Sequence, residues 1–211
     1  MFLVDNTNKL KDIMEFKEGT YYKFVCLVRA KDFKDNPENQ VLHCMEKQEI
    51  LVKDWLVDTP KRLEGTLPDM LKFTEMFKCR LYMCTDRKSV VKTLKTMRDT
   101  VQNYLDPFLG NPNASCSVRA VKKIASSASN MEESSDKGGR CFLFDVDTKD
   151  KSTLEKVVEM CEDYYLATFK TKSGYHVVAK RNFDGKKALK TLNLESVELK
   201  DNAMVLVAMG A

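Results

Sequence analysis

The sequence predicts an α+β protein in which an N-terminal α/β module precedes a C-terminal module of six alternating elements. Two observations support this fold class. The first half alternates short apolar runs with segments of helical periodicity, and residues 141–208 contain strand, helix, strand, strand, helix and strand patterns with short connections. At 211 residues, with 31% charged and 43% hydrophobic residues, the chain is expected to form a single compact unit rather than a fibrous or wholly disordered one.

The N-terminal module is expected over residues 1–108. Its predicted elements are strands at 23–28, 48–52 and 80–84 and helices at 66–78 and 90–105. The strands are short apolar runs, whereas the helices have apolar residues at every third or fourth position. The Asp, Asn and Pro residues at 35–39 predict a turn, and the second helix is expected to end before Pro107.

Residues 109–140 lose this periodicity. They contain Gly-Asn-Pro-Asn at 110–113 and a serine-rich, mixed-charge run that ends in two glycines at 126–139. This composition predicts a linker or a mobile flap between the two modules.

The C-terminal module, residues 141–211, is predicted to have the order βαββαβ, which is the split βαβ order of ferredoxin-like and RNA-recognition-motif folds. Its predicted elements are strands at 141–147, 165–170, 175–180 and 204–208 and helices that begin at 152 and 183. Ser152 and Glu155 have the spacing of a capping box, and the Lys-Ser-Gly run at 172–174 predicts the tight turn of a hairpin.

This topology is expected to gather polar side chains at one edge of the C-terminal sheet. The first strand lies between the third and the fourth, so its end meets the starts of both. Asp145 and Asp147 lie at the end of the first strand, His176 begins the third and Asp201 precedes the fourth. Because side chains alternate along a strand, both aspartates are expected opposite the phenylalanine face that the helices cover.

A pair of carboxylates on an apolar strand is unfavourable unless a positive charge neutralises it. Mg²⁺ or Mn²⁺ does so, and both ions prefer oxygen ligands from carboxylates and substrate phosphates. Asp145 and Asp147 therefore predict metal-dependent nucleotidyl transfer. The alternative interpretations are that the pair forms a turn and that His176 is a hydrogen-bonded core histidine; the convergence of all three residues favours the functional interpretation.

Three sequence segments resemble the signature of the archaeo-eukaryotic primase superfamily, which includes compact primases and primase-polymerases of phages and plasmids. They are Phe144-Asp-Val-Asp147, Lys172-Ser-Gly-Tyr-His176 and the acid of Leu199-Lys-Asp201. Their spacings, 31 residues from 145 to 176 and 25 from 176 to 201, are similar to those of compact members. The motifs cover the last third of the chain.

The resemblance implies that Asp145, Asp147 and Asp201 hold the metal ions. It also implies that His176, with Ser173 or the hairpin backbone, contacts the phosphates of an incoming nucleotide that a 3′-hydroxyl attacks. The small-x-His motif is either Gly174-Tyr-His176 or Ser173 displaced by one residue, and Glu198 or Glu195 remains an alternative third acid. Lys172 and Lys180 are expected beside the nucleotide, and Arg80 and Arg87 flank a strand able to reach the same cleft.

The expected partners are nucleoside triphosphates, a single-stranded DNA or RNA template and a separate helicase, since the sequence has no helicase motor. A formal charge of +4 permits a nucleic-acid partner without requiring one. Neither a signal peptide nor a membrane span is evident, so a cytoplasmic location is expected, in the host cell if a phage encodes the chain. The seven cysteines are expected to be reduced and mostly buried.

Three alternative functions follow from the same pattern. A non-catalytic RNA-binding module would need aromatic residues on the open face of the C-terminal sheet, where residues 141, 143, 145 and 147 are Cys, Leu, Asp and Asp. A different palm-type enzyme would need an acidic residue in the hairpin, which has Ser-Gly-Tyr-His instead. An accessory protein that keeps the fold without activity remains open.

Overall fold

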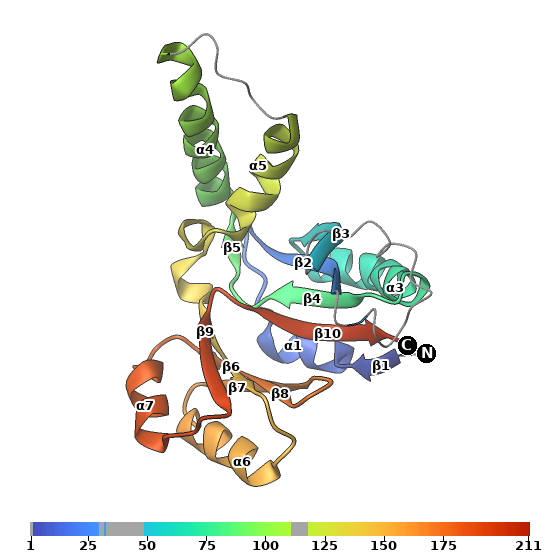
Figure 1. The fold of residues 1–211 in the computed structure, drawn as a ribbon, viewed down its shortest axis with the longest axis vertical. Helices are drawn as coiled ribbons and strands as arrows, with labels where there is room; N and C mark the ends of the chain where they lie inside the picture. The colour runs from blue at the N-terminus through green and yellow to red at the C-terminus, as the bar shows by residue number, and fades with distance from the viewer. Residues whose placement is uncertain (1, 30–31, 33–48, 111–117) are drawn as a thin grey trace.

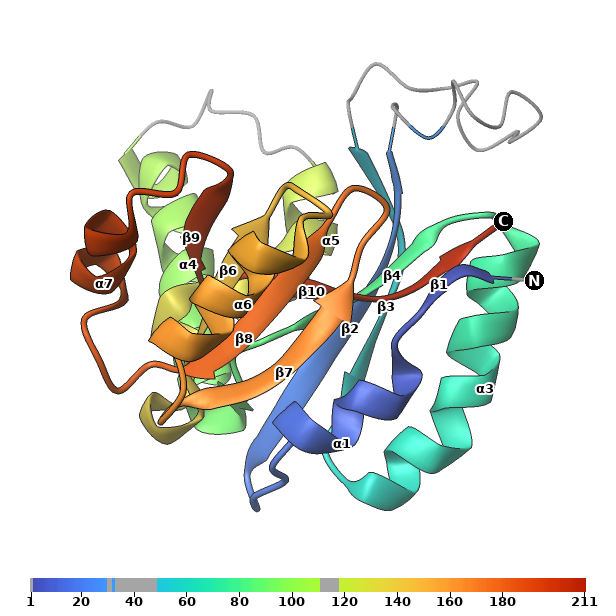
Figure 2. The ribbon, with the colours of Figure 1, turned by 90° about the horizontal axis from the view of Figure 1, so that it is seen from below.

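A computed structural model describes residues 2–29, 32, 49–110 and 118–211 of the protein. The turn expected at 35–39 lies outside these residues. The architecture is α+β, as the sequence predicts, with two antiparallel sheets that pack against each other and helices on their outer sides (Figures 1 and 2).

The first sheet has its strands in the order β1-β10-β4-β2-β3, and a short strand, β5, also pairs with β2. The strands are β1 (Phe2–Asp5), β2 (Thr20–Arg29), β3 (Glu49–Val57), β4 (Arg80–Cys84), β5 (Lys88–Ser89) and β10 (Met204–Gly210). Helix α3 (Pro60–Met76) packs on this sheet, and α1 (Leu10–Ile13) follows β1 after a 3-10 turn. Thr59 caps α3, which begins earlier than predicted because Pro60 suits the first helical turn.

The second sheet has the order β7-β8-β6-β9. Its strands are β6 (Cys141–Val146), β7 (Tyr165–Lys170), β8 (Tyr175–Lys180) and β9 (Val197–Asp201), with α6 (Lys151–Met160) and α7 (Gly185–Leu192) in the connections. The cap of α6 is Asp150, whose carboxylate accepts the amides of Ser152 and Thr153, rather than the predicted Ser152.

The prediction for the last strand of the second sheet is wrong. Residues 197–201 form that strand, whereas residues 204–210 form β10 and lie between β1 and β4 in the first sheet. The near-continuous apolar run of β10 is typical of a strand that is buried on both faces, which suits a central position. The edge strand β9 alternates apolar and charged residues because only one of its faces is covered.

The two faces of the second sheet belong to different cores. Phe142 and Phe144 pack beneath α6 and α7, as the alternation predicts. On the opposite face, Leu143, Phe169 and Val178 join one buried cluster with residues of the first sheet. The first sheet therefore covers the open face of the second, and polar residues remain only at its edge.

The segment predicted as a linker or flap is folded where the structure describes it. Helix α4 runs from Val90 to Gly110, past Pro107, and α5 (Val118–Asn130) is followed by two 3-10 turns at 132–134 and 137–139. Three buried cations of the first sheet and its β4–β5 connection hold this segment: Lys23, Arg87 and Lys88. The serine residues, which by composition predict a linker, therefore provide hydrogen-bond acceptors for buried charges.

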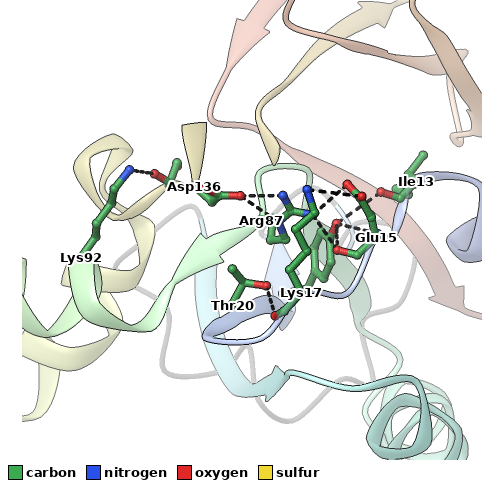
Figure 3. Close-up of polar contacts among 9 residues, drawn as sticks. Ile13, Glu15, Lys17, Thr20, Arg87, Lys92 and Asp136 are labelled. Carbon is green, nitrogen blue, oxygen red and sulfur yellow. Dashed lines mark hydrogen bonds and ion pairs between the residues drawn. The ribbon is translucent and has the colours of Figure 1, made fainter. Parts of the chain in front are cut away.

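Each of these cations has several partners. The Lys23 ammonium donates to both the carbonyl and the hydroxyl of Ser126 and to the hydroxyl of Ser129. Lys88 donates to the Ser135 hydroxyl at 2.9 Å. Arg87 forms ion pairs with Glu15 and Asp136 at 2.9 and 2.6 Å (Figure 3).

Five cysteines, at 26, 79, 84, 141 and 161, are free thiols and buried, as expected. Cys44 and Cys116 lie outside the described residues. Burial raises the pKa of Cys141 and of Cys161 to about 12, so both thiols stay protonated at neutral pH. In the part of the chain that the structure describes, no helix combines the length and apolarity required to cross a bilayer.

Candidate functional site

A polar pocket of about 430 Å³ lies between the two sheets. The second sheet and its β7–β8 turn contribute Asp145, Asp147, Thr171, Lys172, Ser173 and His176 to its lining, and the first sheet with the segment after β2 contributes Arg29, Asp32, Arg80, Tyr82 and Leu206. Five of the predicted site residues, Asp145, Asp147, Lys172, Ser173 and His176, thus share one cavity. Its volume is in the range of small-molecule sites.

Asp145 lies at the centre of this site because β6 is flanked by β8 and β9. It pairs in register with His176 on one side and with Glu198 on the other. Its Oδ1 lies 3.4 Å from Nε2 of His176, and its Oδ2 lies 2.5 Å from Nζ of Lys200. These contacts, with that of His176 foremost, lower the pKa of Asp145 to about 2 against the opposing effect of burial.

His176 connects the two sheets. Its Nδ1 accepts a hydrogen bond from the backbone amide of Leu206 in β10 at 3.4 Å, and its Nε2 faces Asp145. This pattern assigns the neutral tautomer with the proton on Nε2, which Nε2 donates to the carboxylate. The imidazole is therefore oriented from both sides, with only 12% of its side chain exposed.

The β7–β8 turn is held against the end of β6. Thr171 and Gly174 exchange hydrogen bonds across the turn, both at 2.9 Å. A Cβ atom at Gly174 would lie 1.9 Å from the carbonyl oxygen of Val146, so only glycine permits this approach. The close packing places Lys172 and Ser173 at the pocket beside Asp147.

The first sheet supplies the opposite wall of the pocket. The Arg80 guanidinium binds both carboxylate oxygens of Asp32, at 2.7 and 2.5 Å, and donates to the Tyr82 hydroxyl at 3.3 Å. Arg29 forms an ion pair with Glu49 and also reaches the Tyr82 hydroxyl, at 3.4 Å. Two guanidinium groups thus meet at one phenol and face the aspartates across the pocket.

Two predicted site residues lie elsewhere. Lys180 pairs with Cys141 and Asp201 pairs with Phe142, so both are near the start of β6, whereas Asp145 is near its end. At about 3.3 Å per residue, this separates them from Asp145 by roughly 10 Å or more along the strand. Asp201 instead lies 3.7 Å from Arg181. The expectation that Asp201 sits beside the carboxylate pair is wrong, because residues 197–201, and not 204–208, form the strand beside β6, and Asp201 lies at the end of that strand opposite Phe142.

The alternative acids have different positions. Glu198 lies opposite Asp145 on β9, and its carboxylate is 3.3 Å from the same Lys200 ammonium that contacts Asp145. Glu195 lies in the connection before β9 and is not among the pocket residues. Arg87 does not reach the pocket, because it is buried between Glu15 and Asp136.

Arg29 and Tyr82 are site residues that the sequence analysis missed, and strand alternation contained the signal. Tyr82 pairs with Val25, and Arg80 pairs with Leu27. Residues 25, 27 and 29 of β2 therefore share a face with 80 and 82 of β4. Arg29 lies two positions beyond Leu27 at the end of β2, so alternation alone places it on the face of Val25 and Leu27. Lys200 lacked such a signal because the sequence predicts the last strand at 204–208 and none at 197–201.

The donor chemistry of the pocket fits a Mg²⁺ or Mn²⁺ ion only in part. Asp145 and Asp147 are hard oxygen ligands, and such ions often take one or two carboxylates from the protein and the rest from phosphates and water. Among the described residues, no three His, Cys, Asp or Glu side chains converge as a preformed cluster. The chain thus offers two ligands, one of which already pairs with Lys200.

No protein-family model, curated protein or solved structure matches this chain. Function is therefore inferred from the geometry of the pocket and from the sequence motifs.

Proposed function

We propose that the pocket between the two sheets binds a nucleoside triphosphate and that the chain is a metal-dependent nucleotidyltransferase, a primase or primase-polymerase that acts on a single-stranded template. The observation that supports this most is the meeting of Asp145, Asp147 and His176 with Arg29 and Arg80 in one cavity. The aspartates on one wall match a metal ion, and the guanidinium groups on the other, which also pair with Asp32 and Glu49, match phosphates.

Each side chain has a role in this proposal. Asp145 and Asp147 hold the Mg²⁺ or Mn²⁺ ion, which when bound neutralises charge on the triphosphate. The Ser173 hydroxyl donates to a phosphate oxygen, and the Nε2–H of His176 would do so in place of Asp145 when that carboxylate holds the ion. Lys172 adds a positive charge at the turn. Across the pocket, the two guanidinium groups contact either the phosphates or the template backbone.

Lys200 and Glu198 orient the site without lining it. The Lys200 ammonium contacts both Asp145 and Glu198, at 2.5 and 3.3 Å, and so fixes the carboxylate in place. This arrangement makes Glu198, rather than Asp201, the third acid of the proposed site. Glu198 acts through Lys200 and is a positioning residue.

The buried face of the second sheet favours catalysis over base stacking. An RNA-binding module of similar element order uses that face as an open platform of aromatic side chains. Here Leu143 and Val178 occupy it and are covered by the first sheet. A nucleic-acid chain would therefore approach the pocket edge rather than the sheet surface.

The experiment that tests the proposal compares the native chain with an Asp145→Ala, Asp147→Ala double variant. Each protein is incubated with Mn²⁺ or Mg²⁺, a single-stranded template and labelled ribo- or deoxyribonucleotides. The native chain should yield template-dependent products, and the double variant should yield none, while both proteins show the same circular dichroism spectrum. Equal product from both proteins, or no product from either with any nucleotide, would refute the enzymatic role.

The ion pair between Asp145 and Lys200 favours a second candidate, an accessory protein that binds nucleotides without turnover. Because Lys200 already neutralises this carboxylate, a phosphate ligand can bind without a metal ion. In that case, calorimetry would detect triphosphate binding that EDTA leaves unchanged, with no product in the primer assay.

A further inference from the structure

Helix α4 has its polar face inside and its apolar face outside. With α5 it projects away from the two sheets (Figure 1). The inner face carries threonines: the Thr93 hydroxyl lies 2.8 Å from the Tyr21 hydroxyl, and the Thr96 hydroxyl lies 3.3 Å from that of Ser134. This is the reverse of an ordinary surface helix, which buries its apolar stripe.

The outer face forms an apolar stripe, here named the α4 stripe, of Val91, Leu94, Val101 and Leu105. Their exposed fractions are 74%, 58%, 38% and 50%. With Arg98 they occupy positions 91, 94, 98, 101 and 105, which alternate steps of three and four as in the seam of a coiled coil. Exposed apolar residues on both sides of Arg98 along one helix face indicate an interaction surface.

The α4 stripe is nearly the same when read in either direction from Arg98, because its apolar residues lie seven and four positions before Arg98 and three and seven positions after it. If a second α4 lies antiparallel with the two-fold axis at Arg98, Val91 of one copy faces Leu105 of the other, and Leu94 lies at the level of Gln102, one position from Val101. A self-complementary surface of this kind is what a two-fold dimer requires.

The charges beside the α4 stripe also favour an antiparallel second copy. Lys95 and Arg98 lie in the N-terminal half and at the midpoint, whereas Asp99 and Asp106 follow. Antiparallel pairing places the basic half of one helix over the acidic half of the other, while parallel pairing would place like charges together. Arg98 at the axis is already neutralised by Asp99, with Nη2 and Oδ1 2.7 Å apart.

We propose that two copies of this chain associate through their α4 stripes, with the helices antiparallel and the two-fold axis at Arg98. A helix of this length spans about 30 Å, so one helix pair buries less than a standard interface. The dimer is therefore weak, with a dissociation constant on the order of 10 μM. The α4 stripe contains no pocket residue, and the proposal is independent of nucleotidyl transfer.

Sedimentation velocity of the full chain, over a concentration range of about a hundredfold around the expected constant, tests the association. The native chain should shift from monomer to dimer, and Leu94→Glu should remain a monomer at every concentration. Met76→Glu is the matched control, because Met76 is a similarly exposed apolar residue, 64% exposed, at the end of α3. A native chain that stays monomeric, or a control that dissociates as fully as Leu94→Glu, overturns the proposal.

Cysteine cross-linking tests the orientation. In a Cys44→Ser, Cys116→Ser background, in which the other five thiols are buried, Arg98→Cys should form disulfide-linked dimers with itself. Val91→Cys should cross-link only when mixed with Leu105→Cys. Efficient self-linking of Val91→Cys would show parallel helices, and a higher oligomer would show a different interface; either result overturns the antiparallel dimer.

Discussion

Asp145 is the residue on which the candidate site depends, and its environment explains both its charge and its position. It is flanked by His176 on β8 and by Lys200 on β9, so three strands fix one carboxylate. Topology and strand alternation alone predict the pairing with His176. They do not identify Lys200, because the strand that contains this lysine alternates apolar and charged residues and is short.

The low pKa of Asp145 predicts acid sensitivity. Because its folded pKa, about 2, is below its unfolded value, the carboxylate stabilises the fold fully above about pH 4, and this contribution is lost as the pH falls towards 2. Asp145→Asn should remove this pH-dependent part, about 2 kcal/mol. Urea denaturation of both proteins between about pH 6 and pH 2 measures the difference in unfolding free energy, which should shrink on acidification. A constant difference over this window contradicts the assignment.

Gly174 predicts a second effect at the scale of one residue. Gly174→Ala places a methyl group against the Val146 carbonyl, so the β7–β8 turn must move away from β6. We expect a stability loss of about 1–3 kcal/mol together with weaker triphosphate binding, measured by denaturation and calorimetry. The matched control is Gly65→Ala in α3, where the added atom meets nothing within 4 Å. This control should gain about 0.5–1 kcal/mol from helix propensity and bind normally.

At the scale of elements, the largest difference between prediction and structure is the serine-rich segment. Composition alone predicts a linker for residues 126–139, because serine and glycine are common in flexible connections. Buried Lys23 and Lys88 reverse this expectation, since each buried ammonium requires oxygen acceptors, which the serines provide. No local pattern indicates these pairings, because Lys23 lies 103 positions from Ser126 and Lys88 lies 47 positions from Ser135.

Lys23→Met tests the role of these buried cations. The side chain is fully buried, and its loss leaves the hydroxyls of Ser126 and Ser129 without their donor. We expect a stability loss of about 2 kcal/mol or more, with faster amide hydrogen exchange confined to α5 and the 3-10 turns. Lys53→Met on the neighbouring strand serves as the control, because the Lys53 ammonium lies over the Trp55 ring, 5.1 Å from its centroid. Unchanged exchange in α5 would show that the cation does not hold this segment.

At the scale of the whole molecule, the fold class and most elements could be predicted, but the relation between the halves could not. Periodicity locates strands such as β4 and helices such as α4 because it reports local burial. It does not say which sheet a strand joins. The apolar run of β10 fits either sheet by pattern, and its pairing with β1 and β4 depends on contacts between residues far apart in the chain.

The shared core predicts that the second sheet does not fold alone. A fragment of residues 141–201 contains all four of its strands, yet it would expose Leu143, Phe169 and Val178, which the first sheet covers in the full chain. We expect this fragment to bind a hydrophobic dye and to give poorly dispersed amide resonances, as molten states do. A fragment with sharp, dispersed resonances and a cooperative thermal transition would show that the halves are independent.

The position of β10 also bears on how the protein is made. A ribosome that has reached residue 203 has produced every other strand of the first sheet, yet β1 and β4 still lack the neighbour that lies between them. Asn6 shows the delay most directly, because its side-chain amide donates to the carbonyl of Leu206, two hundred positions later. The first sheet therefore closes only after translation has passed both halves, and the nascent chain must keep an unpaired strand edge from aggregating until then.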